Sequence, residues 1–300
     1  MADHLPPRPA DGHKGTFGTV GIVGGCNERG PSVCDPPGSS GTMMIGAPAL
    51  AARAALRCGC GRVIIGAARS ILAPILTCCH SATGWPLTMD EEPLSDGSVV
   101  PRVLELDRQV QTLAVGPGFG IKRTVSGGIV RELLSRPGAP LVLDADALHG
   151  MAQAQPSGRL RDVVLTPHPG EFRVLAEAYS TGDAGVDDES RRAAAIELAA
   201  ATEAVVVLKG HGTVVATRDG AWTCPTGGVE LAVPGSGDVL TGVLASVLAQ
   251  QVARGDLDVV GAARLAVTLH ANAGAVWREA HGDRGMLAEE LADALPAASR

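Results

Sequence analysis

Aromatic side chains are scarce in this chain of 300 residues, which holds three Phe, three Trp and one Tyr. A surface that binds single-stranded nucleic acid needs aromatic platforms on which bases stack, so the composition argues against such a partner. Apolar residues still make up 45% of the sequence. We therefore expect a globular protein whose core is built mainly from Ala, Val, Leu and Ile.

Basic charge is also in short supply, because the formal net charge is −7 at pH 7. This balance removes the usual electrostatic attraction to nucleic acid or to an anionic membrane. The start of the chain has no charged-then-apolar signal pattern. We find no apolar run of 18 residues, and the best candidate, residues 43–56, contains Arg53. We expect a cytoplasmic protein without a membrane segment.

The seven cysteines are an odd number and include no CxxC pair. Cys58 and Cys60 are separated by one residue, and Cys78 and Cys79 stand next to His80. Zinc sites favour wider spacings than these. We expect reduced, structural thiols, which fits a cytoplasmic location.

Short runs of β-branched and aliphatic residues recur along the chain, and alanine-rich stretches with helical spacing lie between them. Buried parallel strands have this composition because helices cover both of their faces. The alternation predicts an α/β fold with a mostly parallel sheet. The expected strands are 19–23, 62–65, 112–115, 141–143, 162–165 and 204–208, and the expected helices are 46–56, 126–134, 170–178 and 189–201.

The chain has no internal repeat and no convincing linker between domains. We therefore predict a single domain over residues 1–300, with flexible termini at 1–12 and 297–300. Two polar stretches, residues 27–41 and 80–98, are expected to be surface excursions.

The segment Gly235-Ser236-Gly237-Asp238 opens an apolar stretch with helical spacing. Small residues at a helix start let backbone N–H groups approach an anion, and the helix dipole favours negative charge there. An aspartate repels phosphate, so Asp238 makes better sense as a base that takes a proton from a hydroxyl attacking a phosphoryl group. The alternative is an ordinary helix start with an acidic first turn.

A second candidate lies at the end of the predicted strand 204–208, where the sequence continues as Lys209, Gly210, His211, Gly212 and Thr213. Ligands of α/β sheets bind at the carboxyl ends of the strands. Lys209 could therefore hold a nucleotide phosphate. The alternative is a simple hairpin turn with an exposed lysine.

A third candidate is His168, which two prolines flank in the segment Leu165-Thr-Pro-His-Pro-Gly-Glu171. The prolines stiffen the backbone and hold the ring in one place. A neutral histidine can exchange hydrogen bonds with a substrate hydroxyl or amide. Glu171 follows at a predicted helix start, so a helix cap with an exposed histidine is equally consistent.

Two further motifs follow predicted strands, Val115-Gly-Pro-Gly-Phe-Gly120 and Leu143-Asp-Ala-Asp-Ala-Leu148. The glycines of the first motif let the backbone approach a phosphate or a ring. Asp144 and Asp146 point to the same side if the chain is extended there. They could then hold Mg²⁺ through water, or they could cap the next helix.

Taken in this order, the motifs resemble the ADP/ATP-dependent NAD(P)H-hydrate dehydratase family, the carboxy-terminal domain of YjeF-type proteins. The resemblance runs from about His13 to Pro296, nearly the whole chain. It is carried by residues 13–25, by Gly46-Ala47, by GPGFG, DADAL, LTPHPGEF, LKGHGT and GSGDVLTG, and by residues 269–274.

The resemblance implies a ribokinase-like, three-layer α/β/α fold. It also implies a carbon–oxygen lyase that repairs NADHX and NADPHX, the hydrated forms of the reduced nicotinamide cofactors. The ring hydroxyl of the S-epimer is phosphorylated from ADP or ATP, with Mg²⁺ accompanying the nucleotide. Phosphate then leaves as the ring nitrogen's lone pair pushes it out.

The resemblance also implies roles for individual residues. The expected contacts to the hydrate are Ala47, Gly118, His168 and Asp238. The expected adenine-nucleotide site is Lys209, Gly210, His211, Gly212 and Thr213 together with Gly237. Asp238 is the expected catalytic base, and the backbone N–H groups of Gly235, Ser236 and Gly237 form the expected anion hole.

The sequence departs from the family pattern mainly on the substrate side. Met44-Ile45 precede Gly46-Ala47 where the family carries a tyrosine, the loop 26–42 is longer, and Leu231 replaces a methionine. We expect an altered substrate wall. The epimerase domain that is often fused in this family is missing, so a separate epimerase is the expected partner. The family's habit of forming dimers or tetramers implies a homo-oligomer.

Two other functions fit parts of the pattern. A kinase of the same fold, acting on a vitamin precursor such as hydroxyethylthiazole or hydroxymethylpyrimidine, would use the same aspartate and anion hole but leave a stable phosphoester. A catalytically degenerate sensor would bind nucleotide without turnover. Retention of Lys209, His168 and Asp238 argues against the sensor, because a pure binder needs no base.

Overall fold

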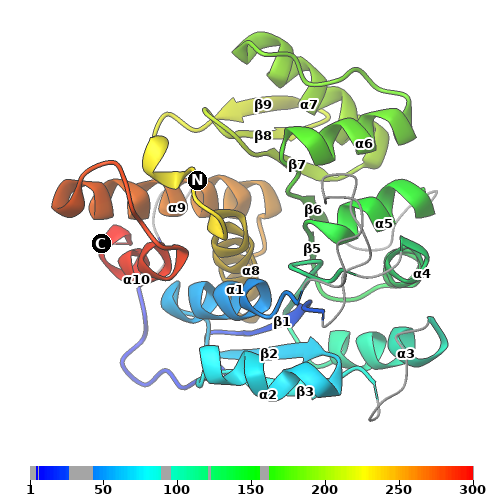
Figure 1. The fold of residues 1–300 in the computed structure, drawn as a ribbon, viewed down its shortest axis with the longest axis vertical. Coiled ribbons are helices and arrows are strands. Elements are labelled where there is room, and N and C mark those ends of the chain that lie inside the picture. Colours follow the sequence, from blue (N-terminus) through cyan, green and yellow to red (C-terminus); the bar gives the residue numbers. More distant parts are fainter. Residues whose placement is uncertain are drawn as a thin grey trace.

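The structure, a computed structural model, describes residues 5, 7–26, 43–88, 96–120, 123–155 and 162–299. Within these residues, nine strands form one sheet in the order β3-β2-β1-β4-β5-β6-β7-β8-β9 (Figure 1). The strands are β1 (Thr19–Val23), β2 (Arg62–Ala67), β3 (Thr83–Pro86), β4 (Thr112–Val115), β5 (Leu141–Leu143), β6 (Val163–Leu165), β7 (Val205–Leu208), β8 (Val214–Thr217) and β9 (Gly220–Thr223).

The helices fill the connections between these strands and the carboxy-terminal part of the chain. They are α1 (Gly46–Arg57), α2 (Arg69–Cys78), α3 (Asp96–Asp107), α4 (Arg123–Leu134), α5 (Asp146–Ala154), α6 (Pro169–Tyr179), α7 (Asp188–Thr202), α8 (Ser236–Arg254), α9 (Val259–His281) and α10 (Ala288–Ala298), with a short 3₁₀ helix η1 (Val229–Leu231) before α8.

The sheet is mostly parallel, as the sequence predicted. Neighbouring strands from β3 to β7 run parallel, and β8 and β9 are added antiparallel at one edge. The strand order reverses its direction between β1 and β4, because the chain builds β2 and β3 on one side of β1 and β4 to β7 on the other. Open α/β sheets bind their ligands beyond the carboxyl ends of the strands at such a switch point.

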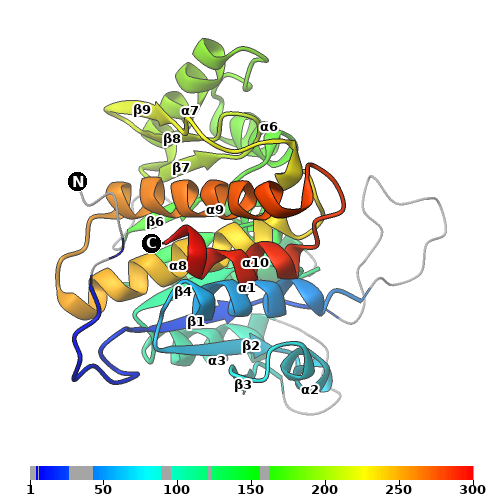
Figure 2. The same ribbon diagram turned by 90° about the vertical axis from the view of Figure 1, so that its left-hand side faces the viewer.

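Alternate residues of each strand face two different helical layers. In β1, Val20 and Ile22 belong to the core cluster that includes residues of α1, α2, α8, α9 and α10. Val23 belongs to the cluster that includes α4, α5, α6 and α7. Figure 2 shows α1, α8, α9 and α10 covering one face of the sheet. The expected three-layer α/β/α architecture is therefore confirmed.

All six strands predicted from the sequence are present, and β1, β4 and β5 match the predicted ranges residue for residue. The predicted ranges did not include the strands β3, β8 and β9 or the helices α2, α3, α5 and α10. Residues 80–98 looked like a polar excursion because edge strands tolerate Gly and Pro, and β3 reads Thr-Gly-Trp-Pro. The predicted excursion at 27–41 lies outside the described residues, but Cys26 and Met44 on either side of it are joined by an antiparallel bridge.

Both ends of the chain make contacts that the sequence did not indicate. The Arg8 guanidinium lies 3.5 Å over the Phe17 ring and donates to the Gly59 carbonyl oxygen at 2.7 Å. At the other end α10 continues to Ala298, inside the range that we expect to be flexible.

Helix α9 is long and apolar enough to cross a membrane by length and composition alone. The sequence had singled out residues 43–56 instead, because charged and polar residues interrupt the apolar pattern of α9. Within the protein, 56% of its apolar window is buried, and α9 packs against α8 and α10. Its apolar composition is therefore accounted for by packing in the core.

The described cysteines form no disulfide, and five of these six side chains are buried; Cys34 lies outside the described residues. Burial raises the pKa of the Cys58 and Cys60 thiols to about 12. Both therefore stay protonated near neutral pH and act as small core side chains, as expected for structural thiols.

We expect Gly242→Ala to destabilise the protein, because α8 and α1 approach each other closely at this glycine. A Cβ at Gly242 would lie 2.1 Å from the Ala51 carbonyl oxygen, so one helix must move. Overpacking of this kind costs about 1–3 kcal/mol in the free energy of unfolding, which chemical denaturation measures. Gly97→Ala is the matched control, since nothing lies within 4 Å of its Cβ position. An equal loss in both variants would contradict the close approach of the helices.

Candidate active site

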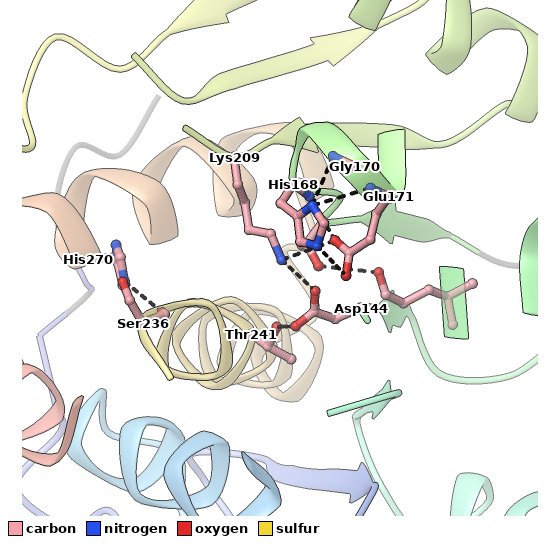
Figure 3. A network of polar contacts seen from close by, with 10 residues as sticks. Asp144, His168, Gly170, Glu171, Lys209, Ser236, Thr241 and His270 are labelled. Atoms are coloured by element: carbon pink, nitrogen blue, oxygen red, sulfur yellow. Dashed lines mark hydrogen bonds and ion pairs between the residues drawn. The ribbon is translucent and has the colours of Figure 1, made fainter. Parts of the chain in front are cut away.

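Charged side chains converge where β5, β6 and β7 end against the start of α8 (Figure 3). Asp144 directly follows β5, Glu171 lies in the first turn of the helix after β6, and Lys209 directly follows β7. Parallel neighbours bring their carboxyl ends to the same edge of the sheet, which is why residues far apart in sequence meet here. Asp238 joins them from the first turn of α8.

Asp144 is fixed from two sides. The Lys209 ammonium donates to its Oδ1 at 2.8 Å, and the Thr241 hydroxyl donates to its Oδ2 at 2.7 Å. Burial alone would raise the pKa of this carboxyl, but the Lys209 charge and these hydrogen bonds hold the pKa below its usual range. Asp144 is therefore the ionised partner of the lysine.

His168 caps helix α6 in a reciprocal arrangement with Glu171. The His168 Nδ1 accepts from the backbone N–H groups of Gly170 at 3.0 Å and Glu171 at 3.3 Å. In return, the Glu171 carboxylate accepts from the backbone N–H of His168 at 2.8 Å. Because Nδ1 accepts, the neutral ring carries its proton on Nε2. The helix cap considered from the sequence is confirmed, and the half-exposed ring has its Nε2 3.4 Å from the Glu171 Oε1.

The carboxyl groups of Glu171 and Asp238 have strongly raised pKa values. Burial raises the pKa of Asp238 to about 7, and the charges of Asp144 and Glu171 add to the rise while Lys209 opposes it. Burial likewise raises the pKa of Glu171 to about 7, with Lys209 opposing at 3.6 Å. Both groups therefore exchange a proton near neutral pH.

The Asp238 carboxylate has no hydrogen-bond partner among the described residues. It lies at the third position of α8, and the helix cap, Gly235, has a left-handed backbone with φ of 88°. A Cβ at Gly237 would lie 3.4 Å from the Lys209 Nζ, so the ammonium sits beside the start of the helix. A base with a pKa near 7, a positive charge and a helix N-terminus thus meet at one place.

The turn after β7 is held by Arg191, a buried residue of α7. Its guanidinium donates to the carbonyl oxygens of His211, of Gly212 at 3.2 Å and of Lys209 at 3.4 Å. Gly210 adopts a φ of 138°, which a side chain at this position would disfavour. The Lys209 side chain is only 17% exposed, so the alternative of an exposed lysine in a simple turn is wrong.

The two small residues expected on the substrate side, Ala47 and Gly118, lie against each other. A Cβ at Gly118 would stand 2.9 Å from the Ala47 Cβ and 3.1 Å from the Met44 Cβ. Gly24, which follows β1, approaches Pro117 so closely that its Cβ would lie 2.2 Å from the Pro117 carbonyl oxygen. These residues border the switch point between β1 and β4, the position at which the fold favours ligand binding.

Asp144 and Asp146 do not form the paired magnesium site considered from the sequence. Ala145 has a φ of 48°, so the chain is not extended there as the paired arrangement requires. Asp146 accepts from the Gly120 N–H at 2.7 Å, while Asp144 is held by Lys209 and Thr241. The described residues contain no cluster of three or more His, Cys, Asp or Glu side chains able to hold a metal ion. The side chains present thus do not fit a protein-held Mg²⁺.

Sequence reasoning missed three residues that shape this site: Thr241, Arg191 and His270. Each lies within an alanine-rich or apolar helix, where a single polar residue is usually a detail of packing. Their positions on the buried faces of α7, α8 and α9 could have been noted, because a polar residue on an apolar helix face needs a partner. The partner itself follows only from the folded chain.

We expect Lys209→Met to lower the free energy of unfolding at pH 8 by about 3 kcal/mol or more, because it leaves Asp144 buried without a counter-charge. Chemical denaturation gives the value. Asp293→Asn is the control, since its ion pairs with Arg53 and Arg57 are one third to one half exposed and such surface pairs are worth about 1 kcal/mol or less each. Similar losses in both variants would show that the Lys209 pair is no more than a surface ion pair.

We expect Asp238→Asn to stabilise the protein increasingly as the pH rises from 5 to 8. The folded pKa of Asp238 is raised to about 7, so the stability contributed by its protonated form is present below the unfolded pKa and is lost as the pH rises through 7. Asparagine does not titrate. The free energy of unfolding of the variant should gain roughly 2–3 kcal/mol over the wild type across this range. A gain that does not change with pH would contradict the raised pKa.

Known proteins match both the sequence and the structure. A family model for NAD(P)H-hydrate dehydratase, Carb_kinase, matches residues 38–297. The ADP-dependent (S)-NAD(P)H-hydrate dehydratase of Bacillus subtilis is 33% identical over 294 residues, which cover 97% of this chain and 92% of that protein. A bifunctional NAD(P)H-hydrate repair enzyme of Moorella thermoacetica is 37% identical over 298 residues, and the chain spans 51% of its length.

Solved structures give the same result. The ADP/ATP-dependent NAD(P)H-hydrate dehydratase of Bacillus subtilis, co-crystallised with ATP/Mg²⁺, superposes with a TM-score of 0.75 at 31% identity, covering 98% of this chain and 93% of that one. A ribokinase-like superfamily protein of Enterococcus faecalis shares the fold, with a TM-score of 0.75 at 22% identity over 98% and 91% of the two chains. The ribokinase-like architecture is thereby confirmed, and the chain belongs to the NAD(P)H-hydrate dehydratase family.

Proposed function

We propose that this enzyme, a lyase, converts (S)-NADHX and (S)-NADPHX to NADH and NADPH with ADP or ATP as phosphoryl donor. One observation carries the proposal: the Asp238 carboxylate has a pKa near 7, no hydrogen-bond partner among the described residues, and a place beside the N-terminus of α8 and the Lys209 ammonium. The family membership supplies the substrate class.

In the first step Asp238 takes the proton of the ring hydroxyl, and the hydroxyl oxygen attacks the terminal phosphorus of the nucleotide. The bond to the bridging oxygen breaks, so ADP leaves as AMP and ATP leaves as ADP. The N–H groups of Gly235 and Gly237 can donate to the transferring phosphoryl group, and the adjacent Lys209 ammonium balances its charge. The Ser236 N–H, also expected in the anion hole, donates instead to the Val233 carbonyl oxygen at 3.3 Å. The helix dipole of α8 acts in the same direction.

In the second step the carbon–oxygen bond to the phosphate breaks. The ring nitrogen supplies the electron pair that expels inorganic phosphate. The neighbouring ring carbon then releases a proton to the departing phosphate or to water, which forms the ring double bond and restores the dihydronicotinamide. The enzyme's task is therefore to orient the two nucleotides and to balance phosphate charge. Ala47, Gly118 and the Nε2–H of His168 are the residues that we assign to the hydrate, and the Arg191-held turn Lys209–Thr213 is assigned to the adenine nucleotide.

Mg²⁺ enters the proposal through the nucleotide, since Mg²⁺ is commonly held by substrate phosphates and a few waters. Asp144 and Asp146 are engaged elsewhere, and we assign no step to them as ligands. We also propose that a separate epimerase supplies the S-epimer, that the protein works in the cytoplasm, and that it assembles as a homo-oligomer.

We expect the purified protein to restore the reduced-nicotinamide absorbance of S-NADHX in the presence of Mg²⁺ and ADP or ATP, with release of inorganic phosphate. Asp238→Ala should lower kcat at least about a hundredfold, because the base is removed. Asp293→Asn is the matched control and should keep wild-type turnover. Asp293 is an exposed carboxylate of α10 that pairs with Arg53 and Arg57 and has no role in the proposed mechanism.

Three other outcomes would each overturn the proposal. A stable phosphoester without recovered absorbance would identify a kinase of the same fold. A thermal shift with nucleotide but no turnover would identify a nucleotide-binding sensor. Equal turnover of Asp238→Ala and wild type would remove Asp238 from the mechanism.

A further inference from the structure

Helix α9 presents one stripe of residues to the segment that leads into the anion hole. His270, Gly274 and Arg278 are spaced by four residues and therefore lie along one face of the helix. All three contact residues between Gly228 and Ser236, the stretch that ends at the first turn of α8.

His270 forms hydrogen bonds with Ser236, at the carboxy-terminal end of this stretch. Its Nε2 lies 2.9 Å from the Ser236 carbonyl oxygen and 3.2 Å from the Ser236 hydroxyl (Figure 3). A carbonyl oxygen only accepts, so Nε2 carries the proton and donates it. Burial lowers the pKa of His270 to about 4, with the charge of Lys209 contributing, and the ring is therefore neutral throughout the physiological range.

The other two residues of the stripe hold the upstream part. A Cβ at Gly274 would lie 2.7 Å from the Leu231 Cδ2, so the absence of a side chain at this position lets Leu231 pack closely against α9. The Arg278 Nη1 donates to the buried Glu230 carboxylate at 3.3 Å. The segment before α8 is thus fixed to α9 at both ends.

We propose that His270 is a positioning residue for phosphoryl transfer: by donating to the Ser236 carbonyl it holds the N–H groups of the anion hole, and the Asp238 carboxylate two residues on, in their reactive arrangement. The proposal rests on the proposed function for its chemistry. His270 itself touches only Ser236 within the anion hole.

A positioning role has a distinct kinetic consequence. Donors aimed at a transferring group stabilise the transition state more than the bound substrates, and small displacements are costly. His270→Leu, which removes the donor, should therefore lower kcat about ten- to a hundredfold while the KM values for S-NADHX and nucleotide change less than about twofold. His270→Gln keeps an N–H donor at a similar reach and should restore most of the lost kcat.

Gln250→Leu is the matched control for a merely structural effect. Gln250 is a buried polar residue of α8, the helix whose first turn His270 contacts from α9. Gln250 donates to Ser246 and to the Cys58 carbonyl oxygen near the other end of α8. This variant should lose thermal stability to an extent similar to that of His270→Leu and keep wild-type kcat.

Amide hydrogen exchange of the peptide covering residues 233–245 tests the same contact without any substrate. Exchange in the first turns of α8 should be faster in His270→Leu than in wild type and in His270→Gln. Unchanged exchange in His270→Leu, or a kcat equal to that of the Gln250→Leu control, would overturn the proposal. Absence of turnover in the wild type would instead contradict the proposed function. The exchange experiment would still show whether His270 stabilises the first turns of α8.

Discussion

The competition of three carboxylates for one buried ammonium is the interaction on which the site depends. Lys209 pairs with Asp144 at 2.8 Å and lies 3.6 Å from Glu171, and its charge also acts on Asp238. Asp144 is the carboxylate that stays ionised, because the Lys209 ammonium lies nearest to it and the Thr241 hydroxyl donates to its second oxygen. For Glu171 and Asp238, the attraction of the Lys209 charge does not offset the cost of burying a carboxylate, so their pKa values rise to about 7. The burial that raises the pKa of Asp238 also lets this carboxyl group exchange a proton near neutral pH, as a catalytic base must.

The rest of the architecture serves to bring these groups together and hold them still. The start of α8 is packed from two sides, since a Cβ at Gly235 would lie 2.7 Å from Leu50 of α1 and 2.9 Å from Ala288 of α10. Close packing of this kind leaves little room for the helix to move. The strand ends supply the other groups, and the Arg191 guanidinium fixes the turn after β7 by donating hydrogen bonds to three carbonyl oxygens.

The parts of the fold that the sequence predicts well are those with a local signal. Buried strands such as β1 and β4 are continuous aliphatic runs, and the Gly-Ser-Gly-Asp start of α8 is visible as a group of small residues before an apolar helix. Edge strands carry no such signal, because only one side of them is paired and their composition is less restricted.

The electrostatics of the site were beyond sequence reasoning because they depend on long-range contacts. Asp144 and Lys209 are 65 positions apart, and Asp144 and Thr241 are 97 apart. Their meeting follows from the order of the strands and the placement of α8, neither of which is visible in local patterns. The same holds for Asp146, which accepts from the Gly120 N–H 26 positions away rather than sharing a site with Asp144.

The folded protein keeps the Asp238 carboxyl partly protonated near neutral pH. Nuclear magnetic resonance of protein labelled with ¹³C at the aspartate side-chain carboxyl, with Asp238→Asn used to assign the signal, measures this directly. We expect a titration midpoint of about 7 for Asp238. A midpoint near 4, the ordinary value for an aspartate, would contradict it.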